Sequence, residues 1–388
     1  MHSIDIAIVG GGPAGLQTAI NLAKLGYTPH IFEEHKKIGL PIQCGEGISA
    51  QVLEEFEISP SQSRGFCVSD YVYTKIHFPP NYLVYGDTKA IMIKRDLFDQ
   101  YLQHKLEDLG GIVHVDSKVH SVKHEDDTAL LSVGTNRDEF NSKIVVLAEG
   151  PNANIAQTLG FSPPQPLIGG YEYKLEGIHA ETLEFFFDTE KYPYGYAWIF
   201  PRDTHSNVGL VTIAKNRKSL LDSFIREKGI DSKRIRKVGG KIPMNGPVSS
   251  LHRQNILLVG DCAGLPNPVF YGGIRLGLIS GKLAAESIHS ALSSENKRMD
   301  LSLYTKKMKQ MPFMKKMNLD CHKFFYSRDN HFLELIGSIF HEKYINRIEN
   351  KELFSILRQL MSQPSLMKHP HGLYKLYKGF KLARDWGF

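Results

Sequence analysis

The 388-residue chain has few cysteines and no long apolar segment. The cysteines form no C-x-x-C pair and no dense framework, which indicates a reducing compartment; they are Cys44, Cys67, Cys262 and Cys321. No run of about 18 apolar residues occurs, so we expect no transmembrane helix. The first expected strand begins at residue 4, which leaves no room for a signal peptide. These absences predict a cytoplasmic protein.

The sequence also lacks internal repeats, low-complexity linkers and a metal-binding pattern. His369 and His371 flank a proline, but no acidic or cysteine partners accompany them, so we expect no metal ion. With 42% hydrophobic and 23% charged residues, the chain is long enough for a large core and for two or three domains.

Charge is distributed unevenly along the chain. Residues 297–388 contain 18 Lys and Arg residues against 8 Asp and Glu residues, a net charge of +10, whereas the whole chain carries +6. Aromatic residues are interleaved with these lysines. One interpretation is a helical cap with solvated lysines; the other is a surface that binds anionic lipid or diphosphate, as a peripheral protein of the inner membrane surface would. No nucleic-acid-binding motif accompanies the charge, so we expect no nucleic acid partner.

A glycine-rich turn near the N-terminus is the most informative feature that is present. A short apolar strand ends in Gly10, Gly12 and Gly15, which fill G-x-G-x-x-G, and an apolar helical face follows. Gly10 allows the tight turn, Gly12 lets a pyrophosphate approach the backbone, and Gly15 lets the helix lie against the strand. A second strand, residues 30–32, ends in Glu33, whose carboxylate is placed to bind a ribose hydroxyl. The pattern predicts a dinucleotide-binding βαβ unit.

Two later segments identify the dinucleotide. Residues 256–261 form an apolar strand that ends in Gly-Asp, and the segment at 271–275 opens a second apolar helix. They resemble the second FAD fingerprint of the glutathione-reductase-like flavoproteins, the superfamily that includes p-hydroxybenzoate hydroxylase. Residues 144–150 resemble the Ala-Asp-Gly strand end of that superfamily, with Glu149 in place of Asp. The resemblance implies FAD as the cofactor.

The same resemblance implies the cofactor-binding residues. Asp261 would hold the ribityl and phosphate end, the helix that starts after Gly273 would face the isoalloxazine, and Arg95 would reach the pyrophosphate from the start of a helix. The full cofactor-binding set implied is Gly10, Gly12, Ala14, Gly15, Glu33, Cys44, Gly45, Gly47, Arg95, Val119, Asp261, Gly273 and Ile274.

Two further motifs narrow the chemistry. Residues 39–47 resemble the G-x-P-x-x-C-G-E-G signature of the geranylgeranyl reductase family, and residues 193–201 resemble its P-x-x-Y-x-W-x-F-P element. Members of this family saturate isoprenoid double bonds in chlorophyll side chains, quinones or archaeal ether lipids. The chain is most similar in pattern to the archaeal lipid branch, digeranylgeranylglycerophospholipid reductase.

The candidate catalytic residues lie in these two motifs. They are Cys44, Glu46, Tyr196 and Trp198. Cys44 is either a small packing residue or a functional thiol beside the flavin. Tyr196, Trp198 and Phe200 alternate, so a strand would place them on one face, either as core or as the lining of an apolar channel. Saturation of a double bond also needs a proton, and the candidate donors are Cys44, Glu46, a tyrosine or a held water.

We expect an α/β fold: a three-layer, Rossmann-like FAD-binding domain, an inserted, mostly antiparallel β substrate domain and a C-terminal helical region. The FAD domain is expected to be discontinuous, over residues 1–62, 93–160 and 250–296. The substrate domain is expected over residues 63–92 and 161–249, and the basic helical region over 297–388. Among the expected elements are a helix that opens at Arg95 and a strand over Tyr71–His77.

The expected function is therefore FAD-dependent reduction of geranylgeranyl-type chains, in a membrane ether lipid or a prenyl diphosphate. An aromatic or quinone monooxygenase of the p-hydroxybenzoate hydroxylase type is the alternative, because hydroxylases share the fold. No second G-x-G-x-x-G occurs, so the electron donor is either NAD(P)H that binds transiently or a ferredoxin.

Overall fold

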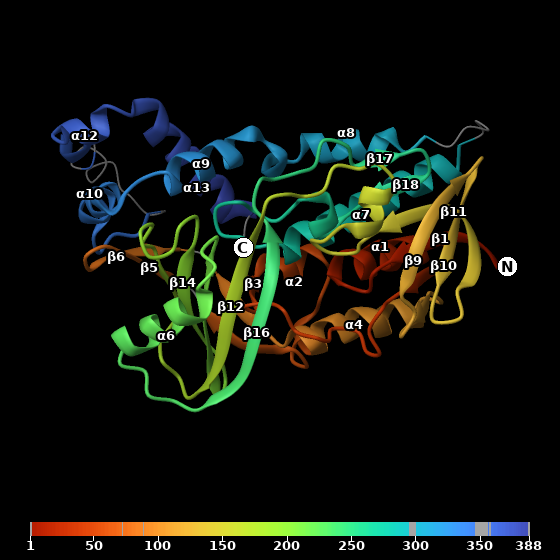
Figure 1. The fold of residues 1–388 in the computed structure, drawn as a ribbon, viewed down its shortest axis with the longest axis horizontal. Coiled ribbons are helices and arrows are strands. Elements are labelled where there is room, and N and C mark those ends of the chain that lie inside the picture. Colours follow the sequence, from red (N-terminus) through yellow and green to blue (C-terminus); the bar gives the residue numbers. More distant parts are fainter. Residues whose placement is uncertain are drawn as a thin grey trace.

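The computed structural model describes residues 2–71, 73–87, 89–294, 300–345, 356 and 358–386. A mostly parallel sheet with its helices occupies one end of the molecule, a mostly antiparallel sheet lies beside it, and the C-terminal helices run along the top of both in Figure 1. This arrangement confirms the predicted fold class.

The first sheet has eight strands, and its central strands are parallel. The order is β17-β18-β11-β1-β2-β8, and the hairpin β9–β10 pairs antiparallel with β11. β1 starts at His2, two residues before the predicted start, and its buried second half, Ile6–Val9, leads into the glycine turn. The strands are β1 (His2–Val9), β2 (Pro29–Phe32), β8 (Ile112–His114), β9 (Val119–Glu125), β10 (Thr128–Val133), β11 (Asp138–Leu147), β17 (His252–Arg253) and β18 (Ile256–Leu258).

Helix α1 packs between α4 and α7. α1 and α7 approach closely because Gly281 has no side chain: a Cβ there would lie 2.6 Å from the Ala14 carbonyl oxygen. α4 opens at Arg95, as predicted, after an extended Lys94. The helices and 3-10 turns of this part are α1 (Pro13–Lys24), α4 (Arg95–Asp108), α5 (Asn154–Thr158), η1 (Gly260–Ala263) and α7 (Ile274–Leu292).

The second sheet has seven strands in the order β16-β12-β15-β14-β13-β5-β6, antiparallel except for the β13–β5 pair. Helix α6 (Arg217–Glu227) covers one face, where Phe224 and Ile225 pack on alternate strand residues. Residues of the other face form one apolar cluster with residues of the C-terminal helices. The strands are β5 (Thr74–Phe78), β6 (Tyr82–Gly86), β12 (Leu167–Glu176), β13 (Leu183–Phe186), β14 (Tyr196–Pro201), β15 (His205–Thr212) and β16 (Arg234–Pro243).

A small third sheet connects the two large ones. Its order is β3-β7-β4, from β3 (Gly47–Ser49), β4 (Cys67–Tyr71) and β7 (Ala90–Ile93), with α2 (Gln51–Glu55) and α3 (Pro60–Ser63) between them in sequence. The single strand predicted over Tyr71–His77 is wrong: β4 ends at Tyr71 and β5 begins at Thr74 in a different sheet. Alternation of aromatic and β-branched residues continues across this junction, so the sequence pattern does not reveal the change of sheet.

The C-terminal region is helical. Its described elements are α8 (Ser302–Gln310), η2 (Pro312–Met314), α9 (Lys316–Tyr326), α10 (Asn330–Phe340), α12 (Pro364–Met367) and α13 (Pro370–Trp386). α13 packs along α9, and α10 packs on β5 and β6. Residues 297–299, 346–355, 357 and 387–388 of the predicted basic region lie outside the described residues. Within the described part, no helix is long and apolar enough to cross a membrane.

Candidate active site

The first glycine turn lies between β1 and α1 and has no room for side chains at two positions. Gly10 has φ +107°, and a Cβ there would lie 2.3 Å from the Ala148 carbonyl oxygen. A Cβ at Gly15 would lie 2.1 Å from the Gly10 carbonyl oxygen, so the helix can begin beside the strand only because Gly15 is there. At Gly12 a Cβ would meet no atom within 4 Å, so this backbone position is open to a ligand.

The start of α1 is suited to an anion. Gly12 is the N-cap and provides no side-chain cap, and the first turn contains Pro13 and no acidic residue. The free N–H groups and the helix dipole at this start therefore favour an anion at the open position next to Gly12.

Glu33 lies at the end of β2, directly beside this turn. Its carboxylate accepts a hydrogen bond from the Gly11 backbone N–H (2.8 Å) and another from the His35 backbone N–H (2.9 Å). The Ser117 N–H donates to the Glu33 carbonyl oxygen, which places the start of β9, at Val119, on the same side of the sheet edge. The predicted ribose-binding acid thus lies beside the glycine turn and is hydrogen-bonded to the segment that leads into β9 at Val119.

The second FAD-like segment meets the first at Ala14. A Cβ at Gly260, in η1, would lie 2.8 Å from the Ala14 Cβ, and Asp261 follows directly. Among the described residues, no hydrogen bond reaches the Asp261 carboxylate. Burial raises its pKa to about 6, although the Arg95 guanidinium opposes that shift. α7 begins next to it: Gly273 is an N-cap without a side-chain cap, and a Cβ there would lie 3.2 Å from the Asp261 Oδ1.

Cys44 and Arg95 lie next to each other. The Cys44 thiol accepts a hydrogen bond from the Glu46 backbone N–H at 3.2 Å, and burial raises its pKa, so it is a neutral thiol at physiological pH even with the Arg95 guanidinium close by. Arg95 forms a bidentate ion pair with Asp99, at 2.8 and 3.0 Å. Asp99 therefore holds the guanidinium in place, close enough to lower the pKa of both the Cys44 thiol and the Asp261 carboxyl group.

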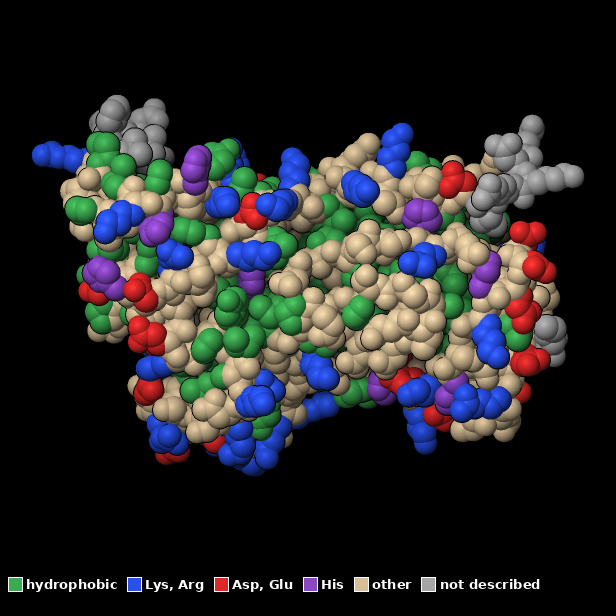
Figure 2. Space-filling view, turned by 45° about the horizontal axis from the view of Figure 1, so that its top comes forward, with side chains coloured by type: hydrophobic (Ala, Val, Ile, Leu, Met, Phe, Trp, Pro, Cys, Tyr) green, Lys and Arg blue, Asp and Glu red, His purple; other side chains and the backbone are tan. Residues whose placement is uncertain are grey.

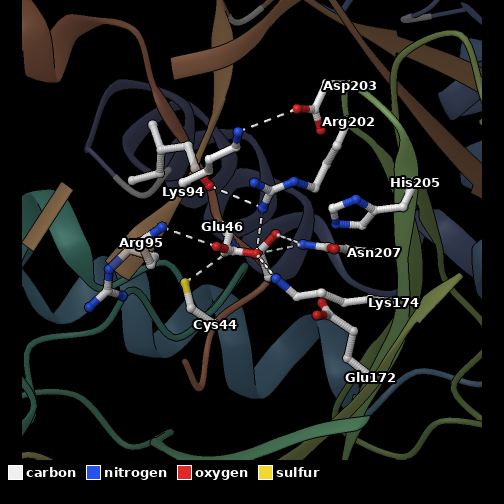
Figure 3. Close-up of polar contacts among 12 residues, drawn as sticks. Cys44, Glu46, Lys94, Arg95, Glu172, Lys174, Arg202, Asp203, His205 and Asn207 are labelled. Carbon is white, nitrogen blue, oxygen red and sulfur yellow. Dashed lines mark hydrogen bonds and ion pairs between the residues drawn. The ribbon is translucent and has the colours of Figure 1, made fainter. Parts of the chain in front are cut away.

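Glu46 is the centre of a buried polar cluster, shown in Figure 3. The residue is 1% exposed and has φ +66°, a conformation that a non-glycine residue adopts only when its surroundings fix it. Its carboxylate receives hydrogen bonds from Lys174, Arg202 and Asn207 and from the Arg95 backbone N–H. Burial by itself raises the pKa of Glu46, but the Arg202 and Lys174 cations more than offset this and lower it, so Glu46 is a carboxylate.

The cluster attaches the Cys44–Gly47 loop to the seven-stranded sheet. The Asn207 side chain donates to the Gly45 carbonyl oxygen at 3.0 Å, and the Arg202 guanidinium also donates to the Ile93 carbonyl oxygen at 3.1 Å. A Cβ at Gly45 would lie 3.4 Å from the Phe200 ring, so the loop lies directly against the sheet face.

Tyr196, Trp198 and Phe200 share that face, as their spacing predicts. They are 5%, 8% and 6% exposed and belong to one apolar cluster with residues of α9 and α10. The Tyr196 hydroxyl donates to the Phe270 carbonyl oxygen, in the loop that precedes α7. The two predicted motifs, the cysteine loop and the aromatic strand, are thus brought into contact.

Family profiles match two consecutive parts of the chain. The family profile "Geranylgeranyl reductase catalytic domain" matches residues 169–242, and the profile "Pyridine nucleotide-disulphide oxidoreductase" matches residues 7–165. A relative from Methanocaldococcus jannaschii, "Digeranylgeranylglycerophospholipid reductase", is 30% identical over 73% of this chain and 77% of its own length.

The chain belongs to the geranylgeranyl reductase family. A second relative, "Digeranylgeranylglycerophospholipid reductase 2" from Methanopyrus kandleri, is 27% identical and spans 96% of this chain and 99% of its own length. The resemblance predicted from the motifs is confirmed.

Solved structures of other proteins have the same fold as this member of the geranylgeranyl reductase family. A geranylgeranyl bacteriochlorophyll reductase-like protein from Thermoplasma acidophilum has a TM-score of 0.84 at 24% identity and covers 96% of this chain, with 100% of its own chain matched. A flavin-dependent brominase has a TM-score of 0.70 at 15% identity, over 92% of this chain and 94% of its own. The fold is that of flavin-dependent oxidoreductases.

Sequence reasoning missed much of the polar cluster in this member of the geranylgeranyl reductase family. Lys174 and a second carboxyl group, Glu172, lie on β12, Asn207 lies on β15, and Arg202 directly follows the end of β14. They are far apart in sequence, so no local motif links them to Glu46. One feature of the sequence did point to the cluster. Glu172 and Lys174 are charged residues two positions apart in a strand whose other residues are mostly uncharged, and a buried charge is costly unless another charged or polar group pairs with it.

Glu149 has a structural role in this fold. Its carboxylate accepts hydrogen bonds from the backbone N–H groups of Ile155 and Ala156, both at 2.8 Å, and so caps the start of α5. Cys262 lies 3.8 Å from it and is completely buried, as expected of a packing residue.

Proposed function

We propose that this protein is an FAD-dependent reductase that saturates carbon–carbon double bonds of geranylgeranyl-type isoprenoid chains, in membrane ether lipids or prenyl diphosphates. The observation that carries the proposal is the contact of the Cys44–Gly47 loop with one face of the seven-stranded sheet, through Asn207 of β15 and the aromatic Phe200 of β14. An apolar, aromatic surface beside a cofactor-binding loop suits an isoprenoid chain, which offers no polar group along its length. The names of the relatives favour a lipid substrate.

The residues fit FAD. The open position at Gly12 and the uncapped start of α1 would hold the pyrophosphate, with Glu33 at the ribose and Val119 beside the adenosine end. Arg95, Asp261 and the α7 start at Gly273–Ile274 would hold the flavin end. Asp261, a half-buried carboxyl without a hydrogen-bond partner in the described chain, is the group that most needs such a ligand.

Reduced FAD would supply the hydride. This chain would supply orientation, exclusion of water and the proton. Tyr196 and Trp198 present π faces that would stabilise carbocation character at a trisubstituted alkene carbon. Cys44, as a neutral thiol, would lie near the reacting carbons, and Gly45 and Gly47 would let the loop backbone approach the flavin. Glu46, as a carboxylate held by two cations, would position the loop rather than donate the proton.

The alternative, an aromatic monooxygenase, shares the fold, and a p-nitrophenol 4-monooxygenase is among the solved structures, with a TM-score of 0.60 at 15% identity over 97% of this chain. Likeness at that level concerns the fold alone. The two functions differ in their need for molecular oxygen: a hydroxylase inserts an oxygen atom into its product, whereas a reductase works without oxygen.

The test is an anaerobic single turnover. The FAD-loaded protein is reduced with dithionite, mixed with geranylgeranyl phospholipid or geranylgeranyl diphosphate, and followed by flavin absorbance and mass spectrometry. We expect flavin oxidation without oxygen and a product that gains two hydrogen atoms for each bond reduced. Cys44→Ala should slow turnover or change which bonds are reduced, whereas Cys67→Ala, in β4, serves as a matched control. A product that forms only with oxygen and contains a new hydroxyl group would instead establish the monooxygenase.

The electron donor is proposed to be NAD(P)H or a ferredoxin.

We also propose that residues 297–388 bind an anionic membrane surface. α13 carries two exposed aromatic side chains, Tyr374 and Tyr377, and the Lys378 ammonium lies 5.7 Å from the centres of both rings. Aromatic and basic side chains on one helix are typical of proteins that lie at the membrane interface.

A further inference from the structure

Glu172 is a buried carboxyl group that the sequence motifs do not include. It lies on β12 and is 2% exposed. One carboxyl oxygen, Oε2, accepts a hydrogen bond from the Trp198 indole N–H at 3.1 Å, and the other, Oε1, has no hydrogen-bond partner among the described residues. A buried oxygen without a partner is costly, and native proteins keep one mainly where it has a function.

The strand register aims Glu172 at the candidate site. Glu172, Gly209 and Trp198 lie opposite one another on β12, β15 and β14, so their side chains share one face. Gly209 makes room for the indole, because a Cβ there would lie 2.4 Å from the Trp198 ring. On the loop side, a Cβ at Gly45 would lie 3.7 Å from the Glu172 carboxyl oxygen. The carboxyl thus lies between the aromatic strand and the loop expected beside the flavin.

The charged groups around Glu172 keep its proton in place. Burial and, next, the Glu46 carboxylate raise its pKa to about 8, whereas Lys174, the Trp198 hydrogen bond and Arg202 lower it to a smaller extent. His205 also faces this cluster, and its own pKa is lowered by burial and by Arg202 and Lys174, so it adds no positive charge at neutral pH. Glu172 is therefore a neutral acid beside an ionised Glu46, two carboxyl groups whose surroundings separate their pKa values.

We propose that Glu172 is the acid that delivers the proton to the alkene in the reduction. This inference rests on the proposed function. One alkene carbon receives the hydride, the other takes the proton from the Glu172 carboxyl, and the π bond is replaced by two C–H bonds. The O–H bond of Glu172 breaks in the same step. The resulting carboxylate regains a proton from water between turnovers, so the flavin loses two electrons and no other oxidant or reductant is needed.

The geometry favours Glu172 over the other acids of the site. All hydrogen bonds to the Glu46 carboxylate come from cations, amides or backbone N–H groups, which hold it ionised. Cys44 is a neutral thiol on the other side of Gly45, and its role as the donor is the competing outcome of the test. Among the acids that the structure describes, only Glu172 combines a carboxyl oxygen without a hydrogen-bond partner with a position against the aromatic strand.

The test compares Glu172→Gln with Glu176→Gln, a control on the same strand and the same face of the sheet but exposed. Both holoenzymes are reduced anaerobically, and the single-turnover rate constant with a geranylgeranyl substrate is measured against pH. Wild type should hold its rate at low pH and lose it above about pH 8, because the acid must be protonated. Glu172→Gln should be slower by about 10²-fold or more, and its rate should not show this fall at alkaline pH, the alkaline limb of the pH profile. Glu172→Asp should restore part of the rate, and Glu176→Gln should behave as wild type.

Two further variants test the assignment even if Glu172→Gln does not fold. Trp198→Phe removes the indole N–H that stabilises the Glu172 carboxylate, so the alkaline limb should move to higher pH. Glu46→Gln removes the neighbouring negative charge, so the limb should move to lower pH. A limb that stays in place in both variants, or that disappears in Cys44→Ala, would overturn the proposal. A wild-type holoenzyme that reduces no prenyl substrate would instead contradict the proposed function.

Discussion

At the residue scale, the two ends of the proposed FAD site are formed by two different kinds of residue, a glycine and a buried acid. Gly12 leaves an open position at the start of α1, so any side chain there would enter the volume where a pyrophosphate would bind. Asp261 is a carboxyl group that receives no hydrogen bond within the described chain and would contact the flavin end. A side chain at Gly12 would meet no protein atom, and the Asp261 carboxylate receives no hydrogen bond among the described residues, so we expect changes at both to affect binding more than folding.

We therefore predict that Gly12→Val combined with Asp261→Ala yields a folded protein without stoichiometric FAD. The purified wild type should be yellow, and the double variant should be colourless with an unchanged far-ultraviolet circular dichroism spectrum. Flavin absorbance per protein is the measurement. Full retention of FAD by the double variant would contradict the cofactor assignment.

Glu46 predicts a pH-dependent contribution to stability. Its pKa is lowered from 4.5 in the folded protein because Arg202 and Lys174 outweigh the effect of burial. A carboxyl group of this kind stabilises the folded state at pH values above 4.5, and the stabilisation is lost as the pH falls through the lower, folded-state pKa.

Glu46→Gln should lower the free energy of unfolding by about 3–5 kcal/mol at neutral pH, because it leaves two buried cations without their partner. The difference from wild type should shrink below pH 4.5. Denaturant unfolding at several pH values measures this. Asp5→Asn breaks an exposed pair with Lys143 and should cost about 0–1 kcal/mol as the control. Equal effects of both variants would show that the cluster is not a structural centre.

At the element scale, the three adjacent strands β12, β15 and β14 create the site through their register. Each row across them places one residue of each strand on the loop-facing side: Glu172 with Gly209 and Trp198, then Lys174 with Asn207 and Phe200. A shift of one residue would turn every one of these side chains to the α6 side. The register therefore decides which polar groups meet the cysteine loop.

Gly209→Ala is the element-scale prediction. The added methyl group would lie 2.4 Å from the Trp198 ring and push the indole away from Glu172, at a cost of about 1–3 kcal/mol in stability. We expect altered tryptophan fluorescence and weaker substrate binding with FAD still bound. The chain has two tryptophans, so a Trp386→Phe background isolates the signal of Trp198. Unchanged fluorescence and substrate affinity would argue against close packing at this row.

At the scale of the whole molecule, packing contacts and hydrogen bonds connect the C-terminal helices to the loop before α7, next to the candidate site. Glycines at 372 and 379 let α13 pack on Phe324 and Cys321 of α9. Two residues of α9 form hydrogen bonds with the loop before α7: the His322 ring with the Pro268 carbonyl oxygen, and the Tyr326 hydroxyl with the Val269 carbonyl oxygen. A surface on α13 is thus linked through α9 to the start of the helix that would face the flavin.

The outer side of this region is basic and partly apolar. Figure 2 shows lysine and arginine side chains spread over the face that carries the C-terminal helices, with hydrophobic side chains among them. Among the described residues of the C-terminal region, the exposed large apolar side chains include Met361, Met367, Tyr374 and Tyr377. Each basic residue near an anionic membrane contributes up to about 1 kcal/mol, and salt screens this attraction.

We predict that the protein sediments with anionic vesicles and that binding falls steeply as salt rises. Tyr374→Ser with Tyr377→Ser should weaken binding at every salt concentration, because the interfacial anchors are removed. Lys237→Gln with Lys241→Gln, on β16, should leave binding unchanged. Equal, salt-independent sedimentation with anionic and neutral vesicles would mean that the C-terminal lysines are only solvated surface.

The sequence determined the features that depend on residues close together in the chain. The turn at Gly10–Gly15, the acid at the end of β2, the helix that opens at Arg95 and the shared face of Tyr196 and Trp198 follow from local geometry and from strand or helix period. The family and the fold class also followed from short motifs and are confirmed. The site roles and the domain boundaries stay predictions.

Tertiary structure alone decided the protonation states. Glu46 meets Lys174 and Arg202 from positions 128 and 156 residues away, and these cations keep it ionised. Glu172 is buried next to that charge and stays protonated. No spacing in the sequence distinguishes the two glutamates, because a pKa depends on burial and on the charges within a few ångströms, and both are set by how distant strands and loops pack.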